Sequence, residues 1–318
     1  MKLHQLRYFV GVADRGSVRA AAEGLGISAA SVSQGLRELE RDVGAPLLRR
    51  EASGAIPTHF GHELLVHARL ILGQVARAEE GLDRLRGLPG GTLSVGVTPW
   101  VSQSLLPGVL RRFRALRPTV RLDLSESLGS AHPGLRDGSQ DIVIGMPPPR
   151  SLGSHFFVRD LFSSGVAVIA RRGHPLAQAT SLAELAGQDW LMTVHHDADE
   201  HTLLSRLQQI GIDPPPERLH CARSSLVAFG MLDASDMLTV CPWPLVEAPL
   251  LRDRVQALPI REPLPEMTTS LVVRRGDALD DTAQLFIECV KDAAEDAVAS
   301  EDPALKRIMR SVEVHPLR

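Results

Sequence analysis

The chain has 318 residues, 44% of them hydrophobic and 23% charged, and its formal net charge at pH 7 is −3. This composition excludes a disordered tail protein, allows two or three domains with sizeable cores, and excludes a generally basic coat for nucleic acids. The chain has an odd number of widely spaced cysteines, Cys221, Cys241 and Cys289, and it has neither a secretory pattern nor an apolar run of about 18 residues. These features predict a cytoplasmic protein with no membrane partner.

Residues 17–39 have the layout of two short helices joined by a tight turn. Ser17 and Ser28 can each cap a helix by accepting a hydrogen bond from a free backbone N–H, and Gly26 allows the sharp turn between them. Gly16 can take the left-handed conformation that ends the preceding helix. Apolar residues at spacings of four and three predict the buried face of the third helix: Val32, Leu36 and Leu39.

The opposite face of the third helix carries small and polar residues, which can approach base edges and phosphates in a major groove. Alanine-rich helix pairs also occur in bundles that bind no DNA, so the two helices alone leave both interpretations open. A short β-ribbon with two arginines at its root follows, and this order predicts a winged helix-turn-helix domain over residues 1–57. The predicted DNA-contacting residues are Arg19, Ser28, Ala29, Ala30, Ser33, Gln34, Arg37, Arg49 and Arg50.

A longer pattern of residues runs through the head and into the start of the next helix: Leu6, Arg7, Tyr8, Phe9, Gly16, Ser17, Ala21, Ala22, Leu25, Ser28, Ser33, Leu36, Leu39, Glu40, Gly44, Leu47, Leu48, Arg50, Thr58 and Gly61. On this pattern, residues 1–61 resemble the N-terminal domain of LysR-type transcriptional regulators. The resemblance implies that this domain binds double-stranded promoter DNA, and it allows a further contact with RNA polymerase.

Four positions of the third helix depart from the pattern of that family. Ala29 and Ala30 replace a Gln-Pro pair, and Gln34 replaces a basic residue. Alanine can touch a thymine methyl group but makes no bidentate bonds to a base, so we expect DNA reading that depends more on phosphate contacts and DNA shape. Gly35 replaces a better helix former, which costs roughly 1 kcal/mol relative to Ala unless a neighbour or the DNA requires a close approach.

Residues 58–89 predict a linker helix that is capped by Thr58. Apolar residues repeat every 3.5 positions through three heptads, and charged residues lie outside the repeat. This seam favours pairing with the same helix of a second copy in a homodimer, and the resemblance adds a homotetramer; an ordinary amphipathic helix lying on its own core is the alternative. The predicted dimerisation seam is Leu64, Ala68, Ile71, Val75, Ala78, Leu82 and Leu85.

Beyond the glycines at 90 and 91, strand and helix patterns alternate, which indicates an α/β domain. The chain order predicts lobe I at 92–161 and 266–300, lobe II at 162–265, and a tail at 301–318 to which we assign no function. Predicted strands are 92–97, 120–125, 141–145, 165–170, 219–222, 238–241 and 270–275, and predicted helices are 104–116 and 280–296.

Within the predicted domain at 90–300, three markers stand out: Val95-Gly96-Val97-Thr98, Leu135-Arg136-Asp137-Gly138 with Asp141, and His174-Pro175-Leu176. On these markers, residues 92 to about 297 resemble the effector domain of LysR-type regulators, which has the fold of type II periplasmic binding proteins. We therefore expect a multidomain protein with an α-rich winged helix-turn-helix, a long coiled-coil linker helix and a two-lobed α/β effector domain.

Ligands of open α/β sheets bind beyond the carboxyl ends of the strands, where helix N-termini present free N–H groups. Applied to the predicted strands, this rule points to a small organic anion as the effector. A resemblance of residues 92–150 to LysR-type regulators that respond to aromatic carboxylates or sulfonates implies an aromatic anion. Loop packing for Trp100 and a surface ion pair for Arg223 are the alternatives. The predicted effector-binding residues are Thr98, Trp100, Ser102, Ser127, Gly129, Ser130, Met146, His195, Arg223 and Ser224.

Two other functions receive less support from the sequence. The loop from His195 to His201 has the composition of a metal site, but polar crowding before a helix is the simpler explanation, so we expect no metal and no cofactor. No nucleophile elbow, phosphate loop or dinucleotide fingerprint is present, and we expect no enzyme. The alternative function is a ligand-binding protein or enzyme whose DNA-binding head is vestigial.

Overall fold

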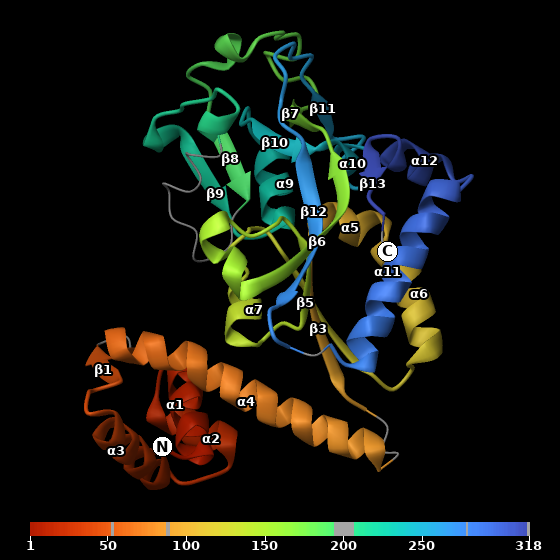
Figure 1. Cartoon of the computed structure of the whole chain (residues 1–318). Coiled ribbons are helices and arrows are strands. Elements are labelled where there is room, and N and C mark those ends of the chain that lie inside the picture. The colour runs from red at the N-terminus through yellow and green to blue at the C-terminus, as the bar shows by residue number, and fades with distance from the viewer. Residues whose placement is uncertain (52–53, 87–89, 194–206, 278, 317–318) are drawn as a thin grey trace. The chain divides into compact units, whose positions relative to one another are not determined.

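Contacts along the backbone divide the chain into two compact units (Figure 1). The first comprises residues 1–91 and 133–140, and the second comprises residues 92–132 and 141–318. The grouping of 133–140 with the first unit was not predicted. The computed structural model describes residues 1–316 apart from 52–53, 87–89, 194–206 and 278.

Three helices form the core of the N-terminal head, and their ends follow from the predicted caps. Ser17 accepts a hydrogen bond from the backbone N–H three residues later (3.0 Å), and Ser28 does the same at 3.1 Å. Gly16 and Gly26, with φ of 70° and 67°, end the first two helices in the left-handed region. Val32 and the other residues of the predicted inner face are buried. The helices are α1 (Leu3–Arg15), α2 (Val18–Leu25) and α3 (Ala29–Val43).

A two-stranded wing follows α3, formed by the antiparallel strands β1 (Leu48–Glu51) and β2 (Gly54–Pro57). The Glu40 carboxylate accepts the backbone N–H of Leu47 at 2.8 Å and so fixes the entry to the wing. The Ala55 N–H donates to the Gly16 carbonyl at 2.6 Å. The wing is therefore bonded to the turn between α1 and α2.

The long helix α4 (His59–Leu85) begins at the predicted cap, where the Gly61 N–H donates to the Thr58 hydroxyl at 3.1 Å. Its first turns complete the head, because Leu65 and Ala68 are buried in the same core as α1 to α3. The short helix α7 (Pro133–Asp137) belongs to this unit as well.

In the described part of the second unit, six strands form the larger sheet, in the order β13-β6-β12-β5-β3-β4. Strand β3 pairs in parallel with β4 and β5, as expected for β-α-β connections. Strand β12 pairs antiparallel with both of its neighbours, β5 and β6. The strands are β3 (Thr92–Val97), β4 (Arg121–Glu126), β5 (Ile142–Gly145), β6 (Phe156–Ser164), β12 (Met267–Arg274) and β13 (Val312–Val314).

Two helices, α6 (Leu106–Leu116) and α11 (Asp281–Ala299), lie side by side over the larger sheet (Figure 1). Phe113 of α6 and Phe286 of α11 are fully buried and pack edge to face, with ring centroids 5.4 Å apart. A short helix that was not predicted, α5 (Pro99–Ser104), precedes α6.

Smaller sheets form the rest of the second unit. Strands β10, β7 and β11 are antiparallel, β8 and β9 are parallel, and a bridge from Trp190 to Leu238 connects the two groups. A continuous apolar cluster includes residues of both the larger sheet and this region. The elements are β7 (Val166–Arg171), β8 (Trp190–Thr193), β9 (Leu219–Ala222), α9 (Ser225–Asp233), β10 (Thr239–Pro242), α10 (Trp243–Val246) and β11 (Val255–Ala257), with single 3-10 turns at Arg150–His155, Leu182–Leu185 and Pro216–Arg218.

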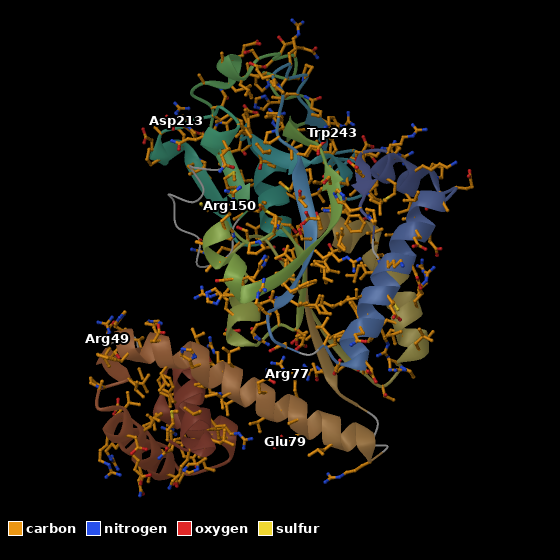
Figure 2. The ribbon with its side chains drawn as sticks, in the orientation of Figure 1. Arg49, Arg77, Glu79, Arg150, Asp213 and Trp243 are labelled. Atoms are coloured by element: carbon orange, nitrogen blue, oxygen red, sulfur yellow. The ribbon has the colours of Figure 1, made fainter. Side chains whose placement is uncertain are left out.

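The chain passes from the larger sheet to the smaller ones at Gly165, and the lobe boundary predicted at 161/162 falls inside β6. The Gly165 carbonyl accepts the N–H of Trp243, and an added Cβ at Gly165 would lie 3.3 Å from the Trp243 ring (Figure 2). Strand β6 therefore runs past the predicted boundary and ends at Ser164, directly before the contact between Gly165 and Trp243.

The predicted tail is part of the fold. Helix α12 (Pro303–Met309) buries Ile308 and Met309 in the apolar cluster, and β13 pairs antiparallel with β6 at the edge of the larger sheet. The His315 ring and the Ser163 hydroxyl add a hydrogen bond of 2.7 Å. In the described part of the chain, no helix combines the length and the apolar character needed to cross a membrane.

Candidate nucleic-acid interface and effector site

The outer face of α3 presents the predicted reading surface. Ala29, Ala30, Gln34 and Arg37 are exposed, and Ser33 is half-buried. The two alanines directly follow the cap, so they occupy the N-terminal turn of α3, the part of a recognition helix that meets base edges.

Gln34 is held by neighbours that the sequence did not reveal. Its amide nitrogen donates to Glu38 Oε1 at 3.1 Å, one helical turn away. The other oxygen of Glu38 accepts the side-chain amide of Gln5, at 3.2 Å, and Gln5 is only 1% exposed. The hydrogen bond from Gln34 lowers the pKa of the Glu38 carboxyl below its ordinary value. Glu38 therefore stays an anion and a hydrogen-bond acceptor at neutral pH.

Gly35 is explained by a neighbour. An added Cβ at this position would lie 2.6 Å from Cδ2 of Tyr8, so the aromatic ring packs directly on the helix backbone. The sequence offered two reasons for a glycine here, a close approach by DNA or by a neighbour. The structure shows a neighbour, the Tyr8 side chain of α1.

The basic residues predicted to contact DNA differ in their surroundings. Arg19 on α2 is exposed. Arg49 at the root of the wing is exposed and forms an ion pair with Glu51 at 2.9 Å (Figure 2). The side chain of Arg50 lies outside the described part of the structure. Exposed pairs of this kind contribute little to stability.

The predicted dimerisation seam divides into two parts along α4. Ala68 is fully buried in the head, and Leu64 packs against the same core. Farther along the helix, Ile71 is 37% exposed and Leu82 is 54% exposed. The remaining seam residues are Val75, which is half-buried, Ala78, which is exposed, and Leu85, whose side chain lies outside the described part.

Several predicted effector-binding residues lie where parallel strands end. Thr98 follows β3 and begins α5, and its backbone N–H donates to the Ile144 carbonyl of β5 at 2.8 Å. Ser127 follows β4, and its N–H donates to the Val97 carbonyl at 2.9 Å. Gly129 and Ser130 continue this loop and are half-buried.

Two of these residues have their side chains engaged within the protein. Trp100 is 1% exposed, its indole N–H donates to Thr269 Oγ1 at 3.0 Å, and its ring packs edge-on against Phe162. Since a buried, satisfied indole has no surface for a ligand, we assign Trp100 to the core and omit it from the proposed site. Ser102 donates its hydroxyl to the Pro99 carbonyl at 2.7 Å.

A carboxylate that the sequence analysis missed lies beside this loop. Glu126, the last residue of β4, accepts the backbone N–H of Ser225 at 3.1 Å through one oxygen and the Ser225 hydroxyl through the other. Ser225 is the first residue of α9, so Glu126 occupies the N-terminus of that helix. No local signal announces this contact, because the partners are 99 positions apart.

The remaining predicted residues of the second unit are distributed around the same helix start and strand ends. Ser224 precedes α9 as its N-cap residue, without a side-chain cap bond, and Arg223 is exposed. Met146 follows β5, and its carbonyl is hydrogen-bonded to the buried His132 ring at 2.8 Å. His195 lies outside the described residues. Within the described ranges, no group of three or more His, Cys, Asp or Glu side chains is placed to hold a metal ion.

Two family models match the chain. The LysR substrate binding domain matches residues 86–295, and the bacterial regulatory helix-turn-helix protein of the lysR family matches residues 3–62. Among curated relatives, the dual regulator OxyR of Escherichia coli is 28% identical over 92% of this chain and 95% of its own. The regulator GalR of Pseudomonas putida is 26% identical over 90% of this chain and 72% of its own.

Solved structures have the same fold. CbnR, described as a LysR family transcriptional regulator, aligns with a TM-score of 0.61 at 22% identity, covering 92% of this chain and 99% of CbnR. Full-length OxyR C199D of Pseudomonas aeruginosa aligns with a TM-score of 0.57 at 20% identity, covering 99% of both chains. With both of its domains matched in order, the chain belongs to the LysR family of DNA-binding transcriptional regulators.

Proposed function

We propose that this regulator binds promoter DNA through α3 and the wing, and that a small organic anion bound in the second unit modulates its activity. The anion site lies where the ends of β3 and β4 meet the first turn of α9. The proposed contributors from the sequence are Thr98, Ser102, Ser127, Gly129, Ser130, Met146, His195, Arg223 and Ser224, to which the geometry adds Glu126 and Ser225.

The contact of Glu126 with Ser225 is the observation that carries the anion proposal. A helix N-terminus with free N–H groups favours negative charge, and here a carboxylate of the protein itself takes that position. The exposed Arg223, two residues before α9, adds positive charge beside it. An effector carboxylate has the same charge and the same acceptor geometry, so it competes with Glu126 for the first turn of α9.

The DNA-binding part of the proposal is supported by the exposed face of α3 and by its order with the wing. Full-length CbnR has been solved in complex with its target DNA, and it aligns with this chain at a TM-score of 0.59 and 22% identity. Since Ala29 and Ala30 cannot donate to bases, we propose that Gln34 and Arg37 provide direct contacts and that Arg19, Ser33 and the wing arginines contact the backbone.

We also propose that the protein acts as a homodimer, or as a tetramer built from two such dimers. The exposed apolar residues Ile71 and Leu82 on α4 support pairing of this helix with a second copy. Two heads joined in this way would present two α3 helices to a pseudo-palindromic site.

A thermal-shift comparison tests the anion site. Full-length protein is heated with a panel of aromatic and aliphatic carboxylates and with the matched carboxamides, which keep the body and remove the charge. We expect at least one carboxylate to raise the Tm in a concentration-dependent way and its amide to have little effect. Equal shifts for every acid and its amide would contradict an anionic effector.

The Glu126→Ala variant locates the site. Removing the internal carboxylate frees the first turn of α9, so the active carboxylate should bind more tightly, by up to about tenfold. Asp123→Ala is the matched control, because Asp123 is an exposed carboxylate on the same strand. If both variants bind like the unmodified protein, the anion lies elsewhere.

A further inference from the structure

The orientation of Gln34 on the reading face is set by a chain of hydrogen bonds that begins inside the head. The backbone N–H of Lys2 donates to Gln5 Oε1 at 2.8 Å. A backbone N–H can only donate, so the oxygen of the Gln5 amide must face Lys2 and its NH2 group must face the other way. That NH2 group donates to Glu38 Oε2 at 3.2 Å, and Gln5 is held in this position by burial.

Glu38 transmits the same constraint to the surface. An ionised carboxylate only accepts hydrogen bonds, so the group of Gln34 that faces Glu38 Oε1, at 3.1 Å, is the NH2 group. The carbonyl oxygen of Gln34 is therefore turned away from Glu38. Gln34 is exposed, and the contacts of the described residues give this oxygen no protein partner.

We propose that Glu38 is a positioning residue which makes Gln34 present its carbonyl oxygen to the major groove, so that each head selects a base with an exocyclic amino group. This inference rests on the proposed role of α3 as the DNA-reading helix. In the major groove, adenine N6 and cytosine N4 are such donors, whereas guanine and thymine present oxygen acceptors at the corresponding place. The second N–H of Gln34 is still free to meet adenine N7, which makes adenine the better of the two partners.

Without Glu38 the same side chain would carry little information. A glutamine amide that is free to rotate by half a turn presents either its oxygen or its NH2 group, and it then accepts guanine and thymine as well. The two fixed hydrogen bonds of Glu38 remove that freedom. The network therefore compensates for the alanines at 29 and 30 with one well-defined polar contact.

Selection from a pool of random-sequence duplex DNA tests the proposal with the full-length protein. We expect the selected motif to contain one position in each half-site restricted to adenine or cytosine, with guanine and thymine disfavoured by about tenfold. Gln34→Ala should lose this restriction and keep the rest of the motif. Glu38→Gln should tolerate guanine or thymine at that position, because the amide of residue 38 can also donate and no longer fixes Gln34.

Glu23→Gln is the matched control, because it removes the same charge from an exposed site on α2. It should raise non-specific affinity as much as Glu38→Gln does and leave the base preference intact. If Glu38→Gln selects the same base at every position as the unmodified protein, the positioning role is overturned.

A second measurement needs no variant protein. In the selected duplex, the adenine at the restricted position is replaced by 2-aminopurine, which still pairs with thymine but has no amino group at position 6. We expect about a tenfold loss of affinity for the unmodified protein, and equal binding of 2-aminopurine and adenine would overturn the acceptor role of Gln34. Failure of the pool to yield any motif with the unmodified protein would contradict the proposed DNA-reading function itself, which is a separate outcome.

Discussion

Gly35 occupies a helical position where a side chain would normally strengthen the helix. Its backbone instead forms the surface on which the Tyr8 ring packs, with the position of an added Cβ only 2.6 Å from the ring. Helix propensity therefore favours alanine at this position, whereas packing against Tyr8 favours glycine. The larger of the two effects decides whether a substitution raises or lowers stability.

The Gly35→Ala variant should be less stable than the unmodified protein. Helix propensity favours alanine by about 1 kcal/mol, but forcing a methyl group against a packed ring costs typically 1–3 kcal/mol, or roughly 1 kcal/mol net. Gly24→Ala is the matched control, since its Cβ would meet only the flexible end of Arg15. Urea unfolding should show a lower midpoint for the first variant and an unchanged or higher one for the second.

The cysteines should differ in reactivity in the folded protein. Burial raises the pKa of the Cys241 thiol, and burial is also the main cause of the raised pKa of Cys289. Cys221 is exposed. Treatment with iodoacetamide followed by peptide mass analysis should find Cys221 alkylated and the other two protected, and rapid alkylation of Cys241 in folded protein would contradict the burial of this side chain.

The same two buried thiols make the free energy of unfolding depend on pH. A thiol whose folded pKa is raised stays protonated in the folded state, while in the unfolded chain it loses its proton above about pH 8.5. The contribution of these thiols to the free energy of unfolding is therefore complete below that pH and falls as pH rises. We expect the free energy of unfolding to decrease between pH 8.5 and 10, and less so in Cys241→Ser.

At the scale of elements, the C-terminal segment has the largest consequence for the fold. Strand β13 pairs with the last three residues of β6 at one edge of the larger sheet, and Ile308 of helix α12 is 1% exposed. An unpaired edge strand is a template for association with other chains.

Truncation after Ser300 should therefore destabilise the second unit and promote aggregation. Loss of the buried Ile308 and Met309 side chains alone removes about 3–6 kcal/mol of burial. A chain that ends at Pro316 keeps both elements and is the control. Thermal unfolding followed by light scattering should separate the two truncations, and equal behaviour would show that β13 contributes nothing to the sheet.

The elements differ in how well the sequence could predict them. Helix caps such as Ser17 and Ser28 depend on residues three positions apart, so their signals are local and the structure agrees with them. Strand β6 was missed, because Arg159 and Asp160 interrupt its apolar pattern; its strand character comes from pairing with β12. Strand β13 is three residues long and has no signal of its own.

The candidate sites show the same difference between local and long-range signals. Proximity of the ends of β3 and β4 could be predicted from parallel pairing, and Thr98 and Ser127 are found there. The burial of Trp100 depends on Thr269, which is 169 positions away, and the contact of Glu126 with Ser225 spans 99 positions. Long-range pairs between side chains are set by tertiary packing, and a single sequence contains no local trace of them.

At the scale of the whole molecule, α4 has two different environments. Its first turns belong to the core of the head, whereas Leu82 is 54% exposed near the other end. We interpret the exposed part as the surface for a second copy of the chain. Arg77 and Glu79 lie on this part of the helix (Figure 2).

Leu82→Glu should weaken association and leave the head folded. A charge in a coiled-coil seam is desolvated without a partner, which is strongly unfavourable. Ala76→Glu places the same charge at an exposed position outside the seam and is the control. Sedimentation equilibrium should show a weaker dimer only for Leu82→Glu, and unchanged association would refute pairing through this seam.

The position of β13 also sets the order in which the chain can finish folding during synthesis. The head is complete once α4 has been made, and it can fold while the rest of the chain is still being translated. The larger sheet is not complete until residues 312–314 have been made, because β13, which pairs with the outer side of β6, comes later in the sequence than the other described strands of that sheet. A nascent chain thus passes through a stage with a finished head and an unpaired outer side of β6, and chaperone demand should concentrate at that stage.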